Sequence, residues 1–114
     1  MDFNEYQNLI KQFDTFENQS SSLTNPAFIA KILGLAGETG EVAEKFKKIY
    51  RDKAGQISEI DKNEIAKELG DVLWYLATIS RYLGIQFEEI AANNISKLQS
   101  RKERNQIHGS GDNR

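Results

Sequence analysis

Apolar side chains recur along most of this chain at the intervals of three and four residues that are typical of amphipathic α-helices. Asp61 and Glu64 have the spacing of a capping box at the start of the clearest run, and Gly84 fits its C-terminal cap. The apolar stripe of this predicted helix alternates between the two intervals: Ile65, Leu69, Val72, Leu76, Ile79 and Leu83.

Three further helices follow from the same pattern. Asp2 and Glu5 form a capping box at the start of the first, and Asn25 suits the N-cap of the second, directly before the single proline of the chain. The predicted helices cover about residues 2–16, 26–50 and 87–98, with a loop over 51–60. The pattern predicts an all-α fold, a four-helix bundle-like protomer of antiparallel helical hairpins.

Composition and charge limit the classes of function. A chain of 114 residues is one domain, which we divide into a helical part, 1–100, and a basic, polar C-terminal tail, 101–114. The net charge of -2 gives no basic field for a nucleic acid polymer or a membrane, and the lack of cysteine excludes thiolate metal sites. The polar N-terminus does not resemble a signal peptide, and no apolar run approaches the roughly 20 residues of a membrane span. We therefore expect a cytoplasmic protein.

Two pairs of acidic residues stand out on the predicted helices. Glu38 and Glu41 lie in GLAGETGEVAE, and Glu68 and Asp71 lie in ELGDVLWYL. At about 100° per residue, each pair falls on the same-handed flank of its own apolar stripe. Because a short loop makes the two helices antiparallel neighbours, these flanks meet on one side of the interface. We expect the four carboxylates to converge there.

Converging carboxylates beside an apolar seam repel one another and lose hydration. A hard divalent cation such as Mg²⁺ or Mn²⁺ removes this conflict and retains open positions for phosphate oxygens and a nucleophilic water. Lys45 shares the flank of the first pair and Tyr75 lies beside the second, so both are candidate substrate-binding residues. The alternative is a set of solvated surface acids paired with nearby lysines.

Three glycines weaken the second predicted helix. Gly34, Gly37 and Gly40 each cost about 1 kcal/mol of helix propensity relative to alanine. Their presence suggests a close backbone approach, to a neighbouring helix in the first instance or to a ligand. One face of this helix is apolar and the opposite face carries small residues. We therefore expect the helix to lie between neighbouring helices and the protein to form a homo-oligomer.

The acid pattern and its flanks resemble the MazG-like branch of the all-α NTP pyrophosphatases. The family pattern is E-x-x-E, a spacer and E-x-x-D, and here 26 residues separate the two pairs. The flanking sequences GLAGETGEVAE and KELGDVLWYLA and the tail SRKERNQIHGSGDNR are also similar to the family, so the resemblance covers most of the chain from about Ile32 onward.

The resemblance implies Mg²⁺-dependent hydrolysis of a nucleoside triphosphate, with Mn²⁺ as a possible substitute, by a metal-activated water to the monophosphate and pyrophosphate. It implies that Glu38, Glu41, Glu68 and Asp71 are catalytic metal ligands, one glutamate also orienting or deprotonating the water. Deoxynucleoside triphosphates are the first expectation, although the spacing separates neither sugars nor bases. Family members form dimers or dimers of dimers, and we expect the tetramer ahead of the dimer.

The resemblance also extends to the last predicted helix and the tail. Asn94, Lys97 and Arg101 resemble phosphate- and sugar-contacting positions, with a solvated basic helix end as the alternative. The ending from Gly109 to Arg114 resembles a segment that folds over substrate, with a mobile tail as the alternative that we expect first without ligand. Trp74 lies opposite the apolar stripe, and we expect it at a subunit contact ahead of a stacked base.

Two other classes compete with this interpretation. A di-iron carboxylate bundle pairs Glu with His on two helices, whereas His108, which has no expected role, lies in the tail. A non-enzymatic helical oligomerisation or interaction module is the remaining alternative. Glu44 and Glu64 are interpreted as structural, Glu44 on the back of its helix and Glu64 in a cap.

Overall fold

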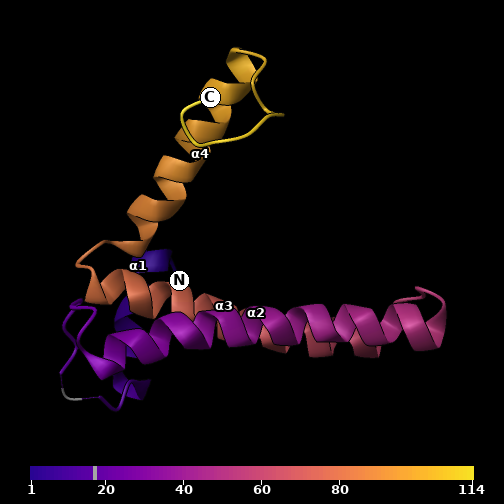
Figure 1. Cartoon of the computed structure of the whole chain (residues 1–114), viewed down its shortest axis with the longest axis horizontal. Coiled ribbons are helices and arrows are strands. Elements are labelled where there is room, and N and C mark those ends of the chain that lie inside the picture. The colour runs from indigo at the N-terminus through magenta and orange to yellow at the C-terminus, as the bar shows by residue number, and fades with distance from the viewer. Residues whose placement is uncertain (17) are drawn as a thin grey trace.

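The computed structural model describes residues 1–16 and 18–114, and every regular element within them is helical (Figure 1). The fold class predicted from the sequence, all-α, is confirmed. The elements in chain order are α1 (Phe3–Leu9), the 3₁₀-helix η1 (Ile10–Phe13), α2 (Pro26–Lys53), α3 (Glu59–Tyr82) and α4 (Phe87–Glu103). None of these helices combines the length and apolar character needed to cross a membrane.

Two of the predicted helix starts are confirmed. The Asp2 carboxylate accepts a hydrogen bond from the Glu5 backbone N–H at 2.8 Å, and the Glu5 carboxylate accepts one from the Asp2 N–H at 2.9 Å. The Asn25 side chain accepts from the Ala27 N–H at 3.0 Å, with proline at the first helical position. The α2 helix ends at Lys53, three residues beyond the expected end.

The predicted start of α3 is wrong. Its capping box joins Ser58 and Asp61, because the Ser58 hydroxyl oxygen accepts the Asp61 N–H at 3.2 Å while the Asp61 carboxylate accepts the Ser58 N–H at 2.9 Å. Asp61 is therefore the third residue of the helix. Glu64 is not a cap and pairs instead with Lys67 at 2.6 Å.

The two long helices α2 and α3 lie side by side (Figure 1). At one end the rings of Phe28 and Tyr82 stack with centroids 6.0 Å apart. At the other end the Lys53 ammonium lies 2.6 Å from the Asp61 carboxylate. The start of α2 thus meets the end of α3, so the pair is antiparallel, as the short connection predicted.

The N-terminal helices close one end of this pair. The Gln7 side chain on α1 donates to the backbone oxygens of Ala77 (3.3 Å) and Ile85 (2.9 Å) and accepts the Phe87 N–H at 3.2 Å. These bonds satisfy backbone groups at the turn between α3 and α4. A small apolar core of Ile10, Ala77 and Phe87 lies beside them.

The α4 helix points away from the α2–α3 pair (Figure 1). After Gly84, whose φ of 70° fits the predicted cap, α4 contacts α1 and α3 but not α2 in the part of the chain described. The radius of gyration of 17.1 Å exceeds the roughly 13 Å of a compact chain of this length. A single chain therefore does not form the four-helix bundle expected from the sequence, since α4 has no long partner helix to pack on.

The C-terminal segment folds back along α4. The buried Arg101 guanidinium donates to the backbone oxygen and the carboxylate of Asp112, both at 3.0 Å. Lys97 also lies 3.3 Å from that carboxylate. The helix itself continues to Glu103, past the division at residue 100, which stays a prediction.

Candidate metal centre

Three of the four predicted acids meet across the α2–α3 seam. Glu38 on α2 and both Glu68 and Asp71 on α3 each offer a carboxylate oxygen, and these oxygens all lie within 4.8 Å of one another. Glu38 and Glu68 are half-buried, whereas Asp71 is exposed at the edge. We call this set the three-acid cluster.

Glu41 does not join the three-acid cluster in this structure. Its side chain is exposed on α2, three residues after Glu38. Its charge still acts on the site, because it is among the groups that raise the pKa of Glu38. The predicted convergence is therefore present for three of the four carboxylates, and Glu41 lies next to the cluster without joining it.

The electrostatics of the cluster fit the expected conflict between like charges. Burial raises the pKa of Glu38 above its usual value, and the nearby Asp71, Glu68 and Glu41 carboxylates raise it further. The donors are hard oxygens from two facing helices, with one carboxylate exposed to solvent. This donor set fits a divalent cation such as Mg²⁺, whose charge would remove the repulsion.

Lys45 lies beside the cluster as predicted, but it pairs with acids. Its ammonium is 3.1 Å from Glu68 and 3.8 Å from Glu64. The hydrogen bond to Glu68 and the charges of Glu68, Glu64 and Glu41 together raise the pKa of Lys45, although desolvation opposes them. A permanent positive charge therefore stands at one side of the three-acid cluster.

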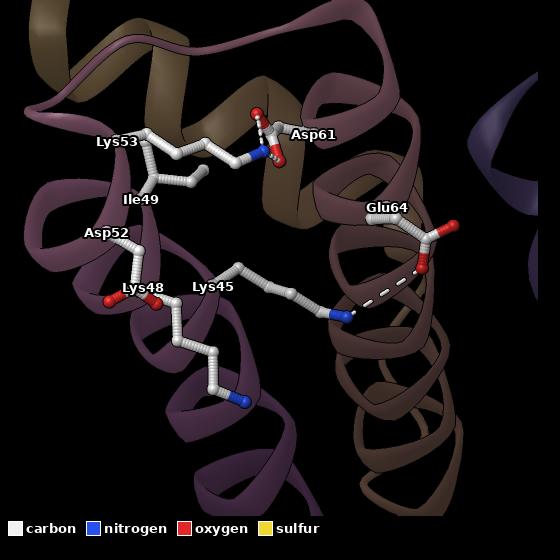
Figure 2. A pocket seen from close by; sticks show the side chains of 7 residues that line it. All are labelled: Lys45, Lys48, Ile49, Asp52, Lys53, Asp61 and Glu64. Atoms are coloured by element: carbon white, nitrogen blue, oxygen red, sulfur yellow. Dashed lines mark hydrogen bonds and ion pairs between the residues drawn. The ribbon is translucent and has the colours of Figure 1, made fainter.

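Lys45 also lines a pocket toward the α2–α3 connection (Figure 2). The pocket has a volume of about 220 Å³, and its walls come from the end of α2 and the start of α3. Its lining consists of Lys45, Lys48, Ile49, Asp52, Lys53, Asp61 and Glu64. Figure 2 shows Lys45 reaching from α2 across to Glu64 on α3.

Tyr75 lies on the other side of the cluster, toward the opposite end of the seam. Its ring rests directly on the backbone of Gly34. The neighbouring Trp74 ring meets it edge-on, with centroids 4.9 Å apart. Trp74 also packs against the core of Ile10, Ala77 and Phe87. Its expected place at a subunit contact stays a prediction.

The predicted α4 residues lie away from the three-acid cluster. Asn94 and Lys97 line a separate groove of about 540 Å³ with residues of the α3–α4 turn, and Arg101 is buried against the tail. Since α4 does not contact α2 in the described chain, these side chains do not complete the acid site within one copy. The tail is ordered on α4 and does not cover the acids.

Sequence reasoning gave α1 no part in the site, yet Tyr6 lies near it. Burial raises the pKa of the Tyr6 phenol, and the charge of Asp71 raises it further. Tyr6 also packs, like Leu73 on α3, against the core of Ile10, Ala77 and Phe87. Only the apolar stripe of the first helix, to which Tyr6 belongs, pointed to packing on another element, and it did not say which one.

Comparison with known proteins identifies the class. Residues 28–105 match the family described as the MazG nucleotide pyrophosphohydrolase domain. The chain belongs to this family, and the resemblance inferred from the sequence is confirmed. Membership supports a hydrolase of the nucleotide pyrophosphohydrolase type.

One relative is the Gene 37 protein of Mycobacterium phage L5, with 49% identity over 82 residues. The aligned region covers 72% of this chain and 72% of the relative. No solved structure matches the chain. The three-acid cluster lies within the region that matches the family.

Proposed function

We propose that this protein hydrolyses nucleoside triphosphates between the α- and β-phosphates to give the monophosphate and pyrophosphate. The observation that carries the proposal is the approach of Glu38, Glu68 and Asp71 to within 4.8 Å across two helices of a MazG domain. Deoxynucleoside triphosphates in the cytoplasm are the substrates that we expect first.

Glu38, Glu68 and Asp71 would hold Mg²⁺, or Mn²⁺ in its place, with Glu41 as the adjacent fourth acid. When bound, the cation lowers the pKa of a coordinated water and neutralises charge on the phosphates. The water oxygen bonds to the α-phosphorus, the bond from this phosphorus to the bridging oxygen breaks, and pyrophosphate leaves. A glutamate of the site takes the proton of the water.

The two sides of the cluster differ in chemistry, which suggests how the substrate lies. The side toward the α2–α3 connection carries Lys45 and the lysine-containing pocket, which suit the negatively charged phosphates. The other side carries the Tyr75 ring, which suits the nucleoside. When the Glu68 carboxylate coordinates the metal ion, it releases the Lys45 ammonium, which can then bind a phosphate of the substrate.

We also propose that the protein acts as a homo-oligomer, a tetramer ahead of a dimer. A stripe at heptad spacing is exposed along α2: Ile32, Ala36, Thr39, Ala43, Phe46 and Tyr50. Leu69 and Leu76 on α3 and Leu83 at its C-cap repeat every seven residues and are also exposed, at 52%, 41% and 49%. Helical stripes of this kind pack on a second helical surface. A neighbouring copy would also provide the α4 residues Asn94, Lys97 and Arg101 that one chain holds away from its own acids.

Pyrophosphate release from a panel of ribo- and deoxynucleoside triphosphates with Mg²⁺ tests the proposed reaction. We expect turnover that EDTA abolishes and that Glu38→Gln lowers by at least about 100-fold, since the variant loses a cation ligand. Glu44→Gln is the matched control on α2, because Glu44 pairs with Lys47 and Lys48 outside the site. Equal activity of the two variants would contradict the assignment of the site.

The second candidate, a non-enzymatic oligomerisation module, is favoured by the exposed stripes on α2 and α3. Association and catalysis are compatible, so the stripes alone do not separate the two functions. Absence of turnover with every triphosphate, together with a thermal midpoint that Mg²⁺ does not change, would decide for the module.

A further inference from the structure

One glycine on the face of α2 that meets α3 provides space for a neighbouring side chain. A β-carbon at Gly34 would lie 2.2 Å from Cε1, 2.4 Å from Cζ and 2.7 Å from the hydroxyl oxygen of Tyr75. Such distances are far below van der Waals contact. The phenol ring of Tyr75 therefore occupies the space that any side chain at position 34 would need.

The other glycines of the same helix do not share this property. A β-carbon at Gly37 or at Gly40 would meet nothing within 4 Å. The close approach that three helix-weakening glycines suggested is thus present in this chain at Gly34 alone among the three. Glycine-to-alanine variants at positions 37 and 40 are therefore matched controls for the same change at position 34.

The contact between Gly34 and Tyr75 borders the three-acid cluster. Glu38 follows Gly34 by four residues on α2, and Asp71 precedes Tyr75 by four residues on α3. Residues four apart on a helix lie on the same face, so the ring stands one turn from a cluster acid on each helix. The edge of the Trp74 ring supports it from α3, with centroids 4.9 Å apart.

We propose that Gly34 is a positioning residue of the nucleotide site, because its missing side chain leaves the seat in which the Tyr75 ring lies against α2 beside Glu38 and Asp71. The consequence for substrate rests on the proposed function, whereas the seat itself does not. Because the Tyr75 ring would contact the nucleoside and not the reacting phosphorus, moving it weakens binding of substrate and transition state alike, which raises KM and leaves kcat unchanged. Tyr75 is only half-buried, so an added methyl group would push its ring outward without unfolding the helix pair.

Gly34→Ala tests the proposal against Gly37→Ala and Gly40→Ala. We expect KM of the first variant to rise about tenfold while kcat stays within about twofold, since Tyr75 contacts the substrate and not the reacting water. The two control variants should keep the KM and kcat of the unaltered protein. A Gly34→Ala variant with the KM of the Gly37→Ala control would overturn the proposal.

A second background separates positioning from a general effect on the helix. In Tyr75→Leu the ring that fills the seat is gone, so adding Gly34→Ala should raise KM no further. Tyr75→Phe retains the ring and should respond to Gly34→Ala as the unaltered protein does. An equal rise of KM in the Leu and Tyr backgrounds would show that Gly34 acts through something other than Tyr75.

The thermal midpoint gives a readout that does not need turnover. Gly34→Ala should melt below Gly37→Ala, and this difference should vanish in the Tyr75→Leu background. If the unaltered protein releases no pyrophosphate, the proposed function fails, while these midpoints still test the seat. Equal midpoints for Gly34→Ala and Gly37→Ala in such an inactive protein would overturn the inference as well.

Discussion

The buried charge of Asp14 is enclosed by two cations and a hydroxyl donor. Its fully buried carboxylate lies 3.2 Å from the Lys31 ammonium and 2.6 Å from the Arg81 guanidinium, and it accepts the Tyr82 hydroxyl at 2.7 Å. The Lys31 ammonium in turn lies 4.8 Å from the centroid of the Trp74 ring. These contacts hold the segment before α2 against both long helices, close to Trp74 and Tyr75 beside the three-acid cluster.

Asp14→Asn should destabilise the protein at pH 7 by about 3–5 kcal/mol, because it leaves the buried Lys31 and the half-buried Arg81 without their anion. Burial raises the pKa of Asp14, but hydrogen bonds from Tyr82 and Lys31 lower it more, and the net pKa lies below the ordinary 3.8. A lowered pKa means that this stability is present above about pH 4 and is lost as the pH falls through the lowered value.

Urea unfolding at pH 7 and pH 3 measures this effect. The difference in unfolding free energy between the unaltered protein and Asp14→Asn should shrink at the lower pH. Asp52→Asn is the control, because Asp52 is an exposed acid that pairs only with its neighbour Arg51 among its described contacts. A difference that is the same at both pH values would contradict the assigned role of Asp14.

At the scale of elements, the capping box at Ser58 fixes the start of α3, the helix that carries Glu68 and Asp71. Ser58 and Asp61 exchange hydrogen bonds, and Lys53 from the end of α2 also contacts Asp61. These bonds to Lys53 and Ser58 hold the pKa of Asp61 at about 2, so its carboxylate stays ionised. The box therefore joins the two long helices close to their connection.

Ser58→Ala should lower the free energy of unfolding by about 1 kcal/mol, the usual cost of removing an N-cap side chain. Glu64→Ala, at the position that sequence spacing assigned to the cap, should change it much less, since Glu64 makes only partly exposed ion pairs. Urea unfolding of both variants checks this order. A larger loss for Glu64→Ala would favour the capping box that the spacing predicted.

For the whole molecule, the main feature is the amount of apolar surface that one chain leaves uncovered. Phe46 and Leu69 are exposed on the long helices, and Ile95 and Leu98 are exposed on α4, which stands apart from them. Apolar stripes that stay uncovered on neighbouring helices are typical of surfaces that contact another protein. An oligomer would supply the packing that the predicted four-helix bundle lacks within one copy.

Light scattering at micromolar concentration should give at least twice the 13.0 kDa mass of one chain. Phe46→Glu, which places a charge in the exposed α2 stripe, should reduce this mass. Leu23→Glu is the control, because Leu23 is even more exposed than Phe46 (70% against 45%) but lies before α2. A monomeric mass for the unaltered protein would overturn the proposed homo-oligomer.

Local signals along the chain were sufficient to predict the helical elements and the approach of acids on α2 to acids on α3. Apolar spacing and the caps at Asp2 and Asn25 placed α1 and α2 because these signals act within a few residues. Helix geometry placed Glu38 on one helix and Glu68 and Asp71 on the next on same-handed flanks. With a short connection between the helices, this predicted that the three carboxylates meet. The family resemblance also depended on these local patterns.

Other features depend on how the elements meet in space, and the local patterns did not predict them. Ser58 is the cap in place of the predicted Asp61, and Asp61 is its capping-box partner, where its carboxylate also lies 2.6 Å from Lys53 at the end of α2. Glu41 lies outside the three-acid cluster although its spacing from Glu38 equals that of the other pair, because which carboxylates face one another depends on how α2 packs on α3. The seat of Tyr75 on Gly34 and the departure of α4 depend on contacts between residues far apart in the chain, which no local pattern encodes.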